Sequence, residues 1–196
     1  ELWRSDGTDA GTYRVKDIAT GSSSSSPTLL TNVNGTLYFQ ATDGTSGVEL
    51  WKSDGTEAGT VRVKDINPSG NSDPRRFVFL NGVVYFTATD GTTGAELWKT
   101  DGTEAGTVRV KDINPGTAGS VQTNLVAIGN TLYFGATDTT HGWELWKSDG
   151  TEAGTVLVKD IYASGNVGSE VDELVNLNGT LYFRARGTSI TTRTNI

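Results

Sequence analysis

The sequence contains no cysteine, no methionine and a single histidine among its 196 residues. The lack of cysteine excludes disulfide bonds, thiolate metal sites and cysteine nucleophiles. With a formal net charge of −7, the chain has no basic stripe of the kind that attracts a nucleic acid, so no nucleic-acid partner is expected. No apolar run approaches the roughly 18 residues that a membrane-spanning helix needs. Membrane insertion is therefore not expected either.

Helix-forming patterns are also missing. Glycine, threonine, valine and aspartate recur throughout, and no apolar pattern repeats about every 3.6 residues. Short segments rich in β-branched and aromatic residues, separated by turn-forming residues, indicate an all-β fold instead. The chain, with 35% hydrophobic residues, is long enough to bury the core of one domain.

The sequence consists of repeated units that each contain the tripeptide Glu-Leu-Trp. The tryptophans of this motif are Trp3, Trp51, Trp98 and Trp146, so they are spaced 48, 47 and 48 residues apart. Each copy leads into a segment of the form [ST]DGT[DE]AGT and then into Val-Lys-Asp-Ile. A Tyr-Phe pair follows later in each unit, usually after an Asn-Gly dipeptide. A period of this length is typical of propeller blades and other repeat arrays.

Each unit is predicted to form four antiparallel strands, which we name A to D. In one unit they span residues 77–80, 83–89, 96–99 and 108–113. Asn-Gly links A to B, since both residues accept the positive φ of a type I′ turn. Along strand B, Leu37 and Phe39 face one side and Tyr38 faces the other, which puts apolar side chains on both faces. Sheets stacked face to face would bury both.

These features predict a β-propeller of four four-stranded antiparallel blades. The chain begins with strands C and D of one unit and ends with strands A and B of another. We therefore expect residues 1–4 to pair with residues 181–185 and to seal the ring, which would hide two open strand edges. Residues 1–186 would form this single domain, and residues 187–196 an irregular tail. Because it starts at Glu1 without a methionine, the chain is expected to be processed or cut from a longer array.

The units ELWKSDGTEAGTVRVKDI and NGxxYFxAxDGTxGxELW resemble the ELWxxDGT repeat, which occurs in tandem in large secreted or surface proteins of bacteria. The resemblance covers nearly the whole chain, except that Arg184-Ala185-Arg186 departs from the pattern. It implies an extracellular or cell-surface repeat module that carries no catalytic residues. We accordingly expect a protein that is not an enzyme.

The loops from D to A and from B to C are expected to open on one face of the propeller. They hold nearly all the differences between units, and variable loops on a fixed frame commonly form binding surfaces. Trp143 is notable because it replaces Val48 and Ala95 of the other units, and an aromatic ring suits the apolar side of a sugar. The candidate ligand-binding residues of this face are Trp143, His141, Asp43, Asp90 and Asp138.

The predicted function is binding or adhesion outside the cell, with a carbohydrate or a protein as partner. The alternative is a structural repeat that recognises copies of itself and builds a filament, a sheath or a larger array. No cofactor is expected. Calcium is the metal that the repeated aspartates would suit, but each loop offers one aspartate where a calcium site needs roughly six to eight oxygens. The interpretation we favour is that each aspartate caps its own turn.

The tryptophans of the Glu-Leu-Trp motif allow two interpretations. Exposed indoles would form a platform on which sugars stack, whereas buried indoles would belong to the core between blades. Trp51, Trp98 and Trp146 stand at the same place in every unit, which favours the core. We expect all three to be buried.

Overall fold

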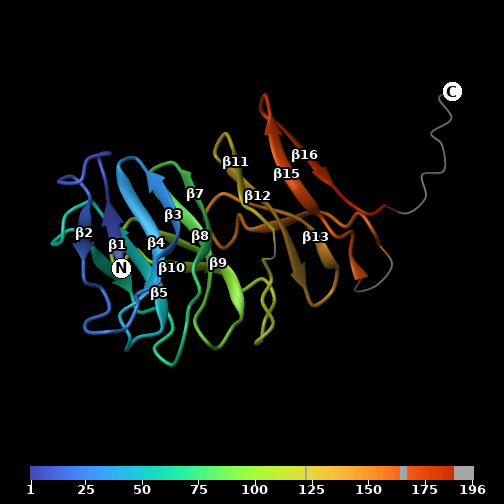
Figure 1. Cartoon of the computed structure of the whole chain (residues 1–196). Helices are drawn as coiled ribbons and strands as arrows, with labels where there is room; N and C mark the ends of the chain where they lie inside the picture. The colour runs from blue at the N-terminus through green and yellow to red at the C-terminus, as the bar shows by residue number, and fades with distance from the viewer. Residues whose placement is uncertain (122, 164–166, 188–196) are drawn as a thin grey trace, which may run out of the picture.

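The computed structural model describes residues 1–121, 123–163 and 167–187. In this part of the chain it contains sixteen β-strands and no α-helix. Three four-stranded antiparallel sheets follow one another, and a two-stranded sheet lies at each end (Figure 1). The predicted all-β class is confirmed. None of these residues belongs to a helix with the length and apolar character to cross a membrane.

In each four-stranded sheet the strands lie in chain order. The first sheet has β3 (Thr28–Val33), β4 (Thr36–Thr42), β5 (Val48–Ser53) and β6 (Val61–Lys64). The second has β7 (Arg75–Leu80), β8 (Val83–Thr89), β9 (Ala95–Thr100) and β10 (Val108–Lys111). The third has β11 (Val126–Ile128), β12 (Thr131–Asp138), β13 (Gly142–Ser148) and β14 (Val156–Lys159). The two end sheets are β1 (Leu2–Arg4) with β2 (Tyr13–Lys16), and β15 (Asp172–Leu177) with β16 (Thr180–Arg184).

The hairpins between strands A and B have the predicted turn geometry. In the first complete sheet, Asn34 has a φ of 48° and Gly35 a φ of 83°. The same pair of positive angles recurs at Asn81-Gly82 and Asn178-Gly179. Type I′ turns match the twist of antiparallel strands and need residues that accept this conformation. The Asn-Gly dipeptides therefore fix where strand A ends and strand B begins.

Among the described residues, three cores lie between successive sheets, and each is built from two neighbouring sheets. Strand C of one sheet contributes Leu, strand D contributes Val, and the segment just after strand D contributes Ile. Strands B and C of the next sheet contribute Phe, Ala and Trp. The first core contains Leu2, Val15 and Ile18 with Phe39, Ala41 and Trp51. The second pairs Leu50, Val63 and Ile66 with Phe86, Ala88 and Trp98, and the third pairs Leu97, Val110 and Ile113 with Phe134, Ala136 and Trp146.

Lysines add polar contacts between neighbouring sheets. Lys52 and Lys99 on strand C donate to the carbonyl oxygens of Gly102 and Gly150 in the next sheet, at 2.8 and 2.9 Å. Lys64 and Lys111 on strand D donate to Thr107 and Thr155 in the same way, both at 2.9 Å. The A strands of successive sheets also contact one another: β3 with β7, β7 with β11, and β11 with β15. The sheets therefore stack as successive propeller blades would.

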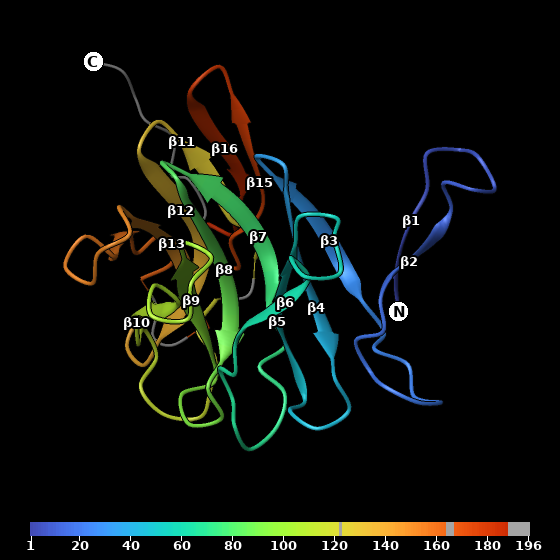
Figure 2. The same ribbon diagram turned by 90° about the vertical axis from the view of Figure 1, so that its left-hand side faces the viewer.

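The predicted sealing of the ring is absent from the structure. β1 pairs with β2 and β16 with β15, and no ladder joins residues 1–4 to residues 181–185. Two views place the two end sheets on different sides of the molecule (Figures 1 and 2). The described residues thus form three complete sheets and two half-sheets, and the predicted closure of a fourth blade is not confirmed. Complementary sequence halves indicate which edges match, but the angle between neighbouring sheets depends on how their cores pack.

The predicted strand limits hold to within two residues. Strand D was expected to reach Ile113, but β10 ends at Lys111. The reason is that the backbone N–H of Ile113 donates to the buried Glu96 carboxylate at 3.0 Å, so it is withdrawn from the ladder. The predicted irregular tail, apart from Gly187, lies outside the described residues.

The repeated tryptophans are buried where the sheets are complete. Trp51, Trp98 and Trp146 are each 6% exposed, whereas Trp3 in the first end sheet is 60% exposed. The predicted core role of the first three is confirmed.

We expect Trp98→Ala to lower the free energy of unfolding by about 3–5 kcal/mol, because it leaves a cavity in the second core. Trp3→Ala is the matched control and should change it by about 0.5 kcal/mol or less, since this indole is largely in solvent. Urea unfolding of both variants measures the difference. Equal losses at the two sites would contradict the assignment of Trp98 to the core.

Candidate functional site

The B–C and D–A loops lie side by side, as the sequence predicts. The backbone N–H of Val48, at the end of a B–C loop, donates to Asn71 Oδ1 in the following D–A loop at 2.9 Å. In the second sheet, Ser120 of the D–A loop donates its N–H to the carbonyl of Ala95 at 3.0 Å. The variable segments of the chain therefore gather on one face.

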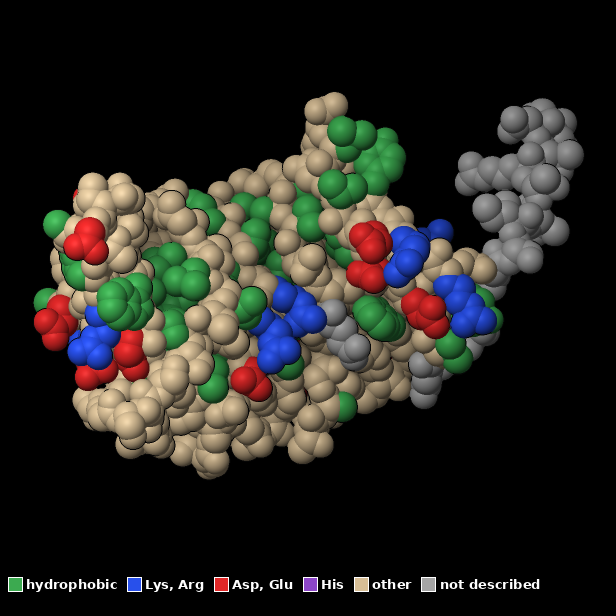
Figure 3. Space-filling view, in the orientation of Figure 1, with side chains coloured by type: hydrophobic (Ala, Val, Ile, Leu, Met, Phe, Trp, Pro, Cys, Tyr) green, Lys and Arg blue, Asp and Glu red, His purple; other side chains and the backbone are tan. Residues whose placement is uncertain are grey.

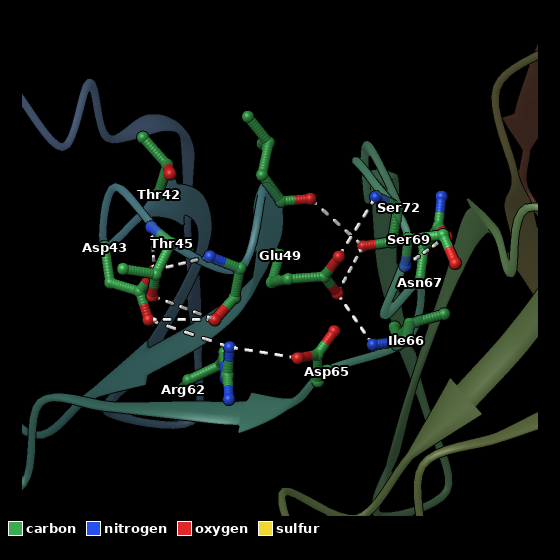
Figure 4. Close-up of polar contacts among 12 residues, drawn as sticks. Thr42, Asp43, Thr45, Glu49, Arg62, Asp65, Ile66, Asn67, Ser69 and Ser72 are labelled. Carbon is green, nitrogen blue, oxygen red and sulfur yellow. Dashed lines mark hydrogen bonds and ion pairs between the residues drawn. The ribbon is translucent and has the colours of Figure 1, made fainter.

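A buried glutamate opens each Glu-Leu-Trp motif and ties this loop face to the sheet. Glu49 accepts the backbone N–H of Ile66 at 2.8 Å, and the hydroxyl and N–H of Ser72 at 2.7 and 3.1 Å (Figure 4). Ile66 follows strand D and Ser72 precedes the next strand A. One carboxyl group thus holds the whole D–A loop against strand C.

The same arrangement recurs in the other units. The sets are Glu96 with Ile113 and Ser120, Glu144 with Ile161 and Ser169, and Glu1 with Ile18 and Ser25. Glu49, Glu96 and Glu144 have no exposed surface. Sequence reasoning did not assign these glutamates a role. The available signal was a serine 23 to 25 residues after each one.

The carboxyls of this repeated site differ in their affinity for a proton. Burial raises the pKa of Glu96 to about 7, even though hydrogen bonds from Ser120 and Ile113 act in the opposite direction. Burial raises the pKa of Glu49 as well. At Glu1, in the half-sheet, burial also acts to raise the pKa, but the combined hydrogen bonds from Ile18 and Ser25 lower it. Burial in the first and second complete sheets therefore favours the neutral forms of Glu49 and Glu96.

The aspartates of the B–C loops cap their own turns. Asp43 Oδ1 accepts the N–H groups of Thr45 and Ser46, both at 2.9 Å, and the Arg62 guanidinium lies 3.6 Å from Oδ2 (Figure 4). Burial acts to raise the pKa of Asp43, but the hydrogen bonds from Thr45 and Ser46 outweigh it and lower the pKa to about 2. Asp90 accepts the corresponding N–H groups of Thr92 and Thr93. Burial acts to raise its pKa as well, but these hydrogen bonds outweigh it and lower the pKa to about 2.

These contacts bear on the question of calcium. The oxygens of Asp43 and Asp90 accept hydrogen bonds from their own loops, which competes with metal coordination. Among the residues that the structure describes, no group of three or more His, Cys, Asp or Glu side chains is placed to hold a metal ion. The turn-capping interpretation accounts for their repetition without a metal.

In the third sheet, His141 is the partner of the B–C loop aspartate, a role that arginine has in the first two sheets. Arg62 and Arg109 pair with the aspartates of their B–C loops, at 3.6 and 3.1 Å. The corresponding residue of β14, opposite Trp146, is Leu157. Asp138 instead lies 2.8 Å from His141 Nδ1 and accepts the backbone N–H of the same residue at 2.6 Å. The only histidine therefore has a structural role in the loop, and its hydrogen bond to Asp138 raises its pKa.

Trp143 is fitted to its sheet by a small partner. An added Cβ at Gly135 would come 2.6 Å from the indole nitrogen of Trp143. Gly135 stands opposite Leu145, at the place that Gln40 and Thr87 hold in the other sheets. The large side chain at 143 and the missing side chain at 135 thus complement each other.

Trp143 also lines a depression of about 430 Å³ between the third sheet and β15–β16. The charged residues in its wall are Glu170, Asp172, Arg184 and Arg186. These residues form two ion pairs. Arg184 Nη2 lies 3.0 Å from Asp172 Oδ2, and Arg186 Nη1 lies 3.6 Å from Glu170 Oε1. Acidic and basic side chains are mixed at the base of this hairpin on the molecular surface (Figure 3).

The structure therefore unites only part of the predicted site. Of the five candidates, Trp143 lines this depression, whereas His141, Asp43, Asp90 and Asp138 do not. Sequence reasoning missed the four charged residues of the depression. Their one signal was the departure of Arg184-Ala185-Arg186 from the repeat pattern.

No protein-family model and no curated protein matches this chain. Among solved structures it is similar to the computationally designed protein Ika8, with 18% identity and a TM-score of 0.45 over 81% of this chain and 42% of that one. A puromycin hydrolase mutant shows 18% identity and a TM-score of 0.43 over 76% of this chain and 23% of its own. An α-L-arabinofuranosidase from Clostridium thermocellum shows 18% and 0.39, over 90% of this chain and 66% of its own. These distant similarities assign neither a family nor an activity.

We expect the pH dependence of stability to differ between Glu96→Gln and the parent. The folded-state pKa of Glu96, about 7, lies above its ordinary value of 4.5, so its contribution is fully present below pH 4.5 and is lost as the pH rises toward 7. Gln stays neutral, so the variant should lose less stability between pH 5 and pH 8. Urea unfolding at several pH values measures this.

The exposed Glu57→Gln is the control for that experiment and should follow the parent at every pH. A Glu96→Gln variant whose stability falls as steeply as that of the parent would show that Glu96 is already ionised at pH 5.

We expect Asp138→Asn to lower the pKa of His141 toward its ordinary value of 6.5, because the variant removes the charge and weakens the hydrogen bond that raise it. His141 is the only histidine, so its imidazole signals in an NMR titration are unambiguous. Asp90→Asn, in the equivalent loop of another sheet, should leave the titration unchanged. An unaltered His141 pKa in Asp138→Asn would refute the pairing.

Proposed function

We propose that the protein is a non-enzymatic binding module that recognises a carbohydrate in the depression lined by Trp143. The observation that carries this proposal is the indole beside four charged side chains in a depression of about 430 Å³. This volume lies in the range of small-molecule sites. An indole suits the apolar face of a sugar ring, and carboxylate and guanidinium groups suit its hydroxyls.

The chemistry of the depression favours recognition over catalysis. Asp172 and Glu170 are each held in an ion pair with an arginine, an arrangement that presents fixed acceptors and donors to a ligand. The depression adjoins the D–A loop that precedes β15, where the units differ most. The proposed setting is outside the cell or at its surface, and it rests on the resemblance to the ELWxxDGT repeat.

We expect Trp143→Ala to weaken glycan binding about tenfold or more, since it removes the stacking surface. A glycan array, followed by titration of the best ligand, measures the effect. Trp3→Ala is the matched control, because it removes another indole outside the depression. Glu57→Ala, in a C–D loop, tests the opposite face.

Both controls should bind as the parent does, and circular dichroism should show that Trp143→Ala is folded. Asp172→Asn provides a second test within the depression and should also weaken binding. Full binding by both variants would exclude this depression as the site. Loss of binding in Glu57→Ala alone would place the site on the face of the C–D loops.

A further inference from the structure

Two neighbouring arginines stand at the bulge in strand A of the second sheet. The pairing of β7 with β8 shifts its register between Arg75 and Val78, and Arg76 has a φ of 61°. The same bulge occurs in β3, where the residue with positive φ is Leu29, and in β15, where it is Glu173. The bulge thus belongs to the common frame, whereas the side chain at it changes between units. Bulges redirect side chains and are over-represented next to active sites.

Both guanidinium groups are positioned by the second sheet and the loop before it. Arg76 Nη1 donates to Thr87 Oγ1 at 3.4 Å, and this buried threonine donates to the carbonyl oxygen of Arg75 at 3.3 Å. Arg75 Nε donates to the carbonyl oxygen of Asp73 at 3.3 Å, and its Nη2 lies 3.7 Å from Asp73 Oδ2. Burial, together with the charge of Arg75, lowers the pKa of Arg76. Two positive charges are therefore held close together in a chain whose net charge is −7.

The two arginines line two depressions. The first has a volume of about 470 Å³ and lies among two D–A loops and the B–C loop of the second sheet, where its wall includes Thr89, Ala95 and Thr117. Ala95 is in register with Trp143 of the third sheet, so equivalent places in successive units carry different chemistry.

The second depression has a volume of about 640 Å³ and follows the A strands of neighbouring sheets. Besides the two arginines, its wall includes Thr28, Gln40, Phe77 and Asn124. Of the described residues that line either depression, Asp73 is the only acidic one. The two depressions therefore combine a local excess of positive charge with uncharged hydroxyl and amide groups. On the face drawn in Figure 3, a group of basic side chains lies near the middle.

From this arrangement we infer that Arg75 and Arg76 form a second binding site, which takes the carboxylate of an acidic sugar, a uronate. A carboxylate matches the planar fork of a guanidinium group, and such charge-assisted hydrogen bonds are strong. The hydroxyl of Thr28 and the amides of Gln40 and Asn124 suit the hydroxyls of a sugar. Phe77 offers apolar surface to its ring.

The uncharged character of the remaining wall favours a sugar acid over an acidic peptide. A uronate brings one negative charge with several hydroxyls, which corresponds to a basic pair surrounded by neutral donors and acceptors. The site does not depend on the recognition proposed for Trp143, because Trp143 lines neither of these depressions.

The first experiment compares two probes that differ in charge alone. A trimer of galacturonate is the acidic probe, and its methyl ester is the matched neutral probe, since esterification removes the charges and keeps the sugar rings. Isothermal titration calorimetry should show that the parent binds the acidic trimer about tenfold or more tightly than the ester. Inorganic phosphate tests the anion without the sugar and should bind more weakly than the trimer.

The second experiment removes each arginine in turn. Arg75→Gln and Arg76→Gln should each weaken binding of the acidic trimer about tenfold or more, because each variant loses a charged hydrogen bond to the carboxylate. Arg14→Gln is the matched control. It removes the same charge from the exposed ion pair with Asp17, outside both depressions, and should bind as the parent does. Circular dichroism should show that all three variants are folded.

Several outcomes would overturn the proposal. One is a parent that fails to bind the acidic trimer at millimolar concentration or binds the ester equally well, and another is full binding by both Arg75→Gln and Arg76→Gln. Phosphate bound as tightly as the trimer would assign the site to free anions, and a glutamate tripeptide bound as tightly would assign it to acidic peptides. Trp143→Ala should bind the acidic trimer as the parent does. Loss of binding in that variant alone would place the carboxylate in the depression lined by Trp143.

Discussion

The buried glutamate of the Glu-Leu-Trp motif is the contact on which the repeat depends. Each D–A loop must leave one sheet and enter the next, and its backbone groups have no ladder partner along the way. Glu49 and its counterparts accept those N–H groups and a serine hydroxyl on a single carboxyl. The leucine and tryptophan that follow then enter the cores on either side of the sheet. One tripeptide thus anchors both the connection and the packing.

This anchoring separates constant from variable positions. The D–A loop is held at Ile66 and Ser72 but is free to vary between them, and the corresponding segments of the other units do vary. Trp143 also stands at a variable position. Its sheet has Gly135 where the other two have Gln40 and Thr87, and the missing side chain makes room for the indole. A depression with its own chemistry can therefore form between two sheets whose frames are nearly identical.

Much of the fold could be predicted from the sequence because its causes are local. The Asn-Gly turns, the strands and the burial of Trp51, Trp98 and Trp146 follow from dihedral preference, alternation and repetition. Ring closure was beyond such reasoning, since it depends on the angle between packed sheets. The positive φ angles of Leu29, Arg76 and Glu173, each at a bulge in strand A, could not be predicted either. The three residues are of different types, and none of these types favours a left-handed conformation. Among the candidate residues, Trp143 was singled out by its departure from the repeat pattern. The charged residues that line the depression with it come from the β15–β16 hairpin and the segment around it, which only the fold brings near Trp143.

The sharing of each core by two neighbours alone has a consequence for how the chain unfolds. In such a linear array, stability is approximately a sum of contributions from units and from the interfaces between them. Among the described residues, the half-sheets β1–β2 and β15–β16 have one neighbour each, whereas each complete sheet has two. Within the described chain, opening should therefore begin at the two half-sheets and proceed inward. The second sheet has a complete sheet on each side, so its amide protons should be the last to exchange.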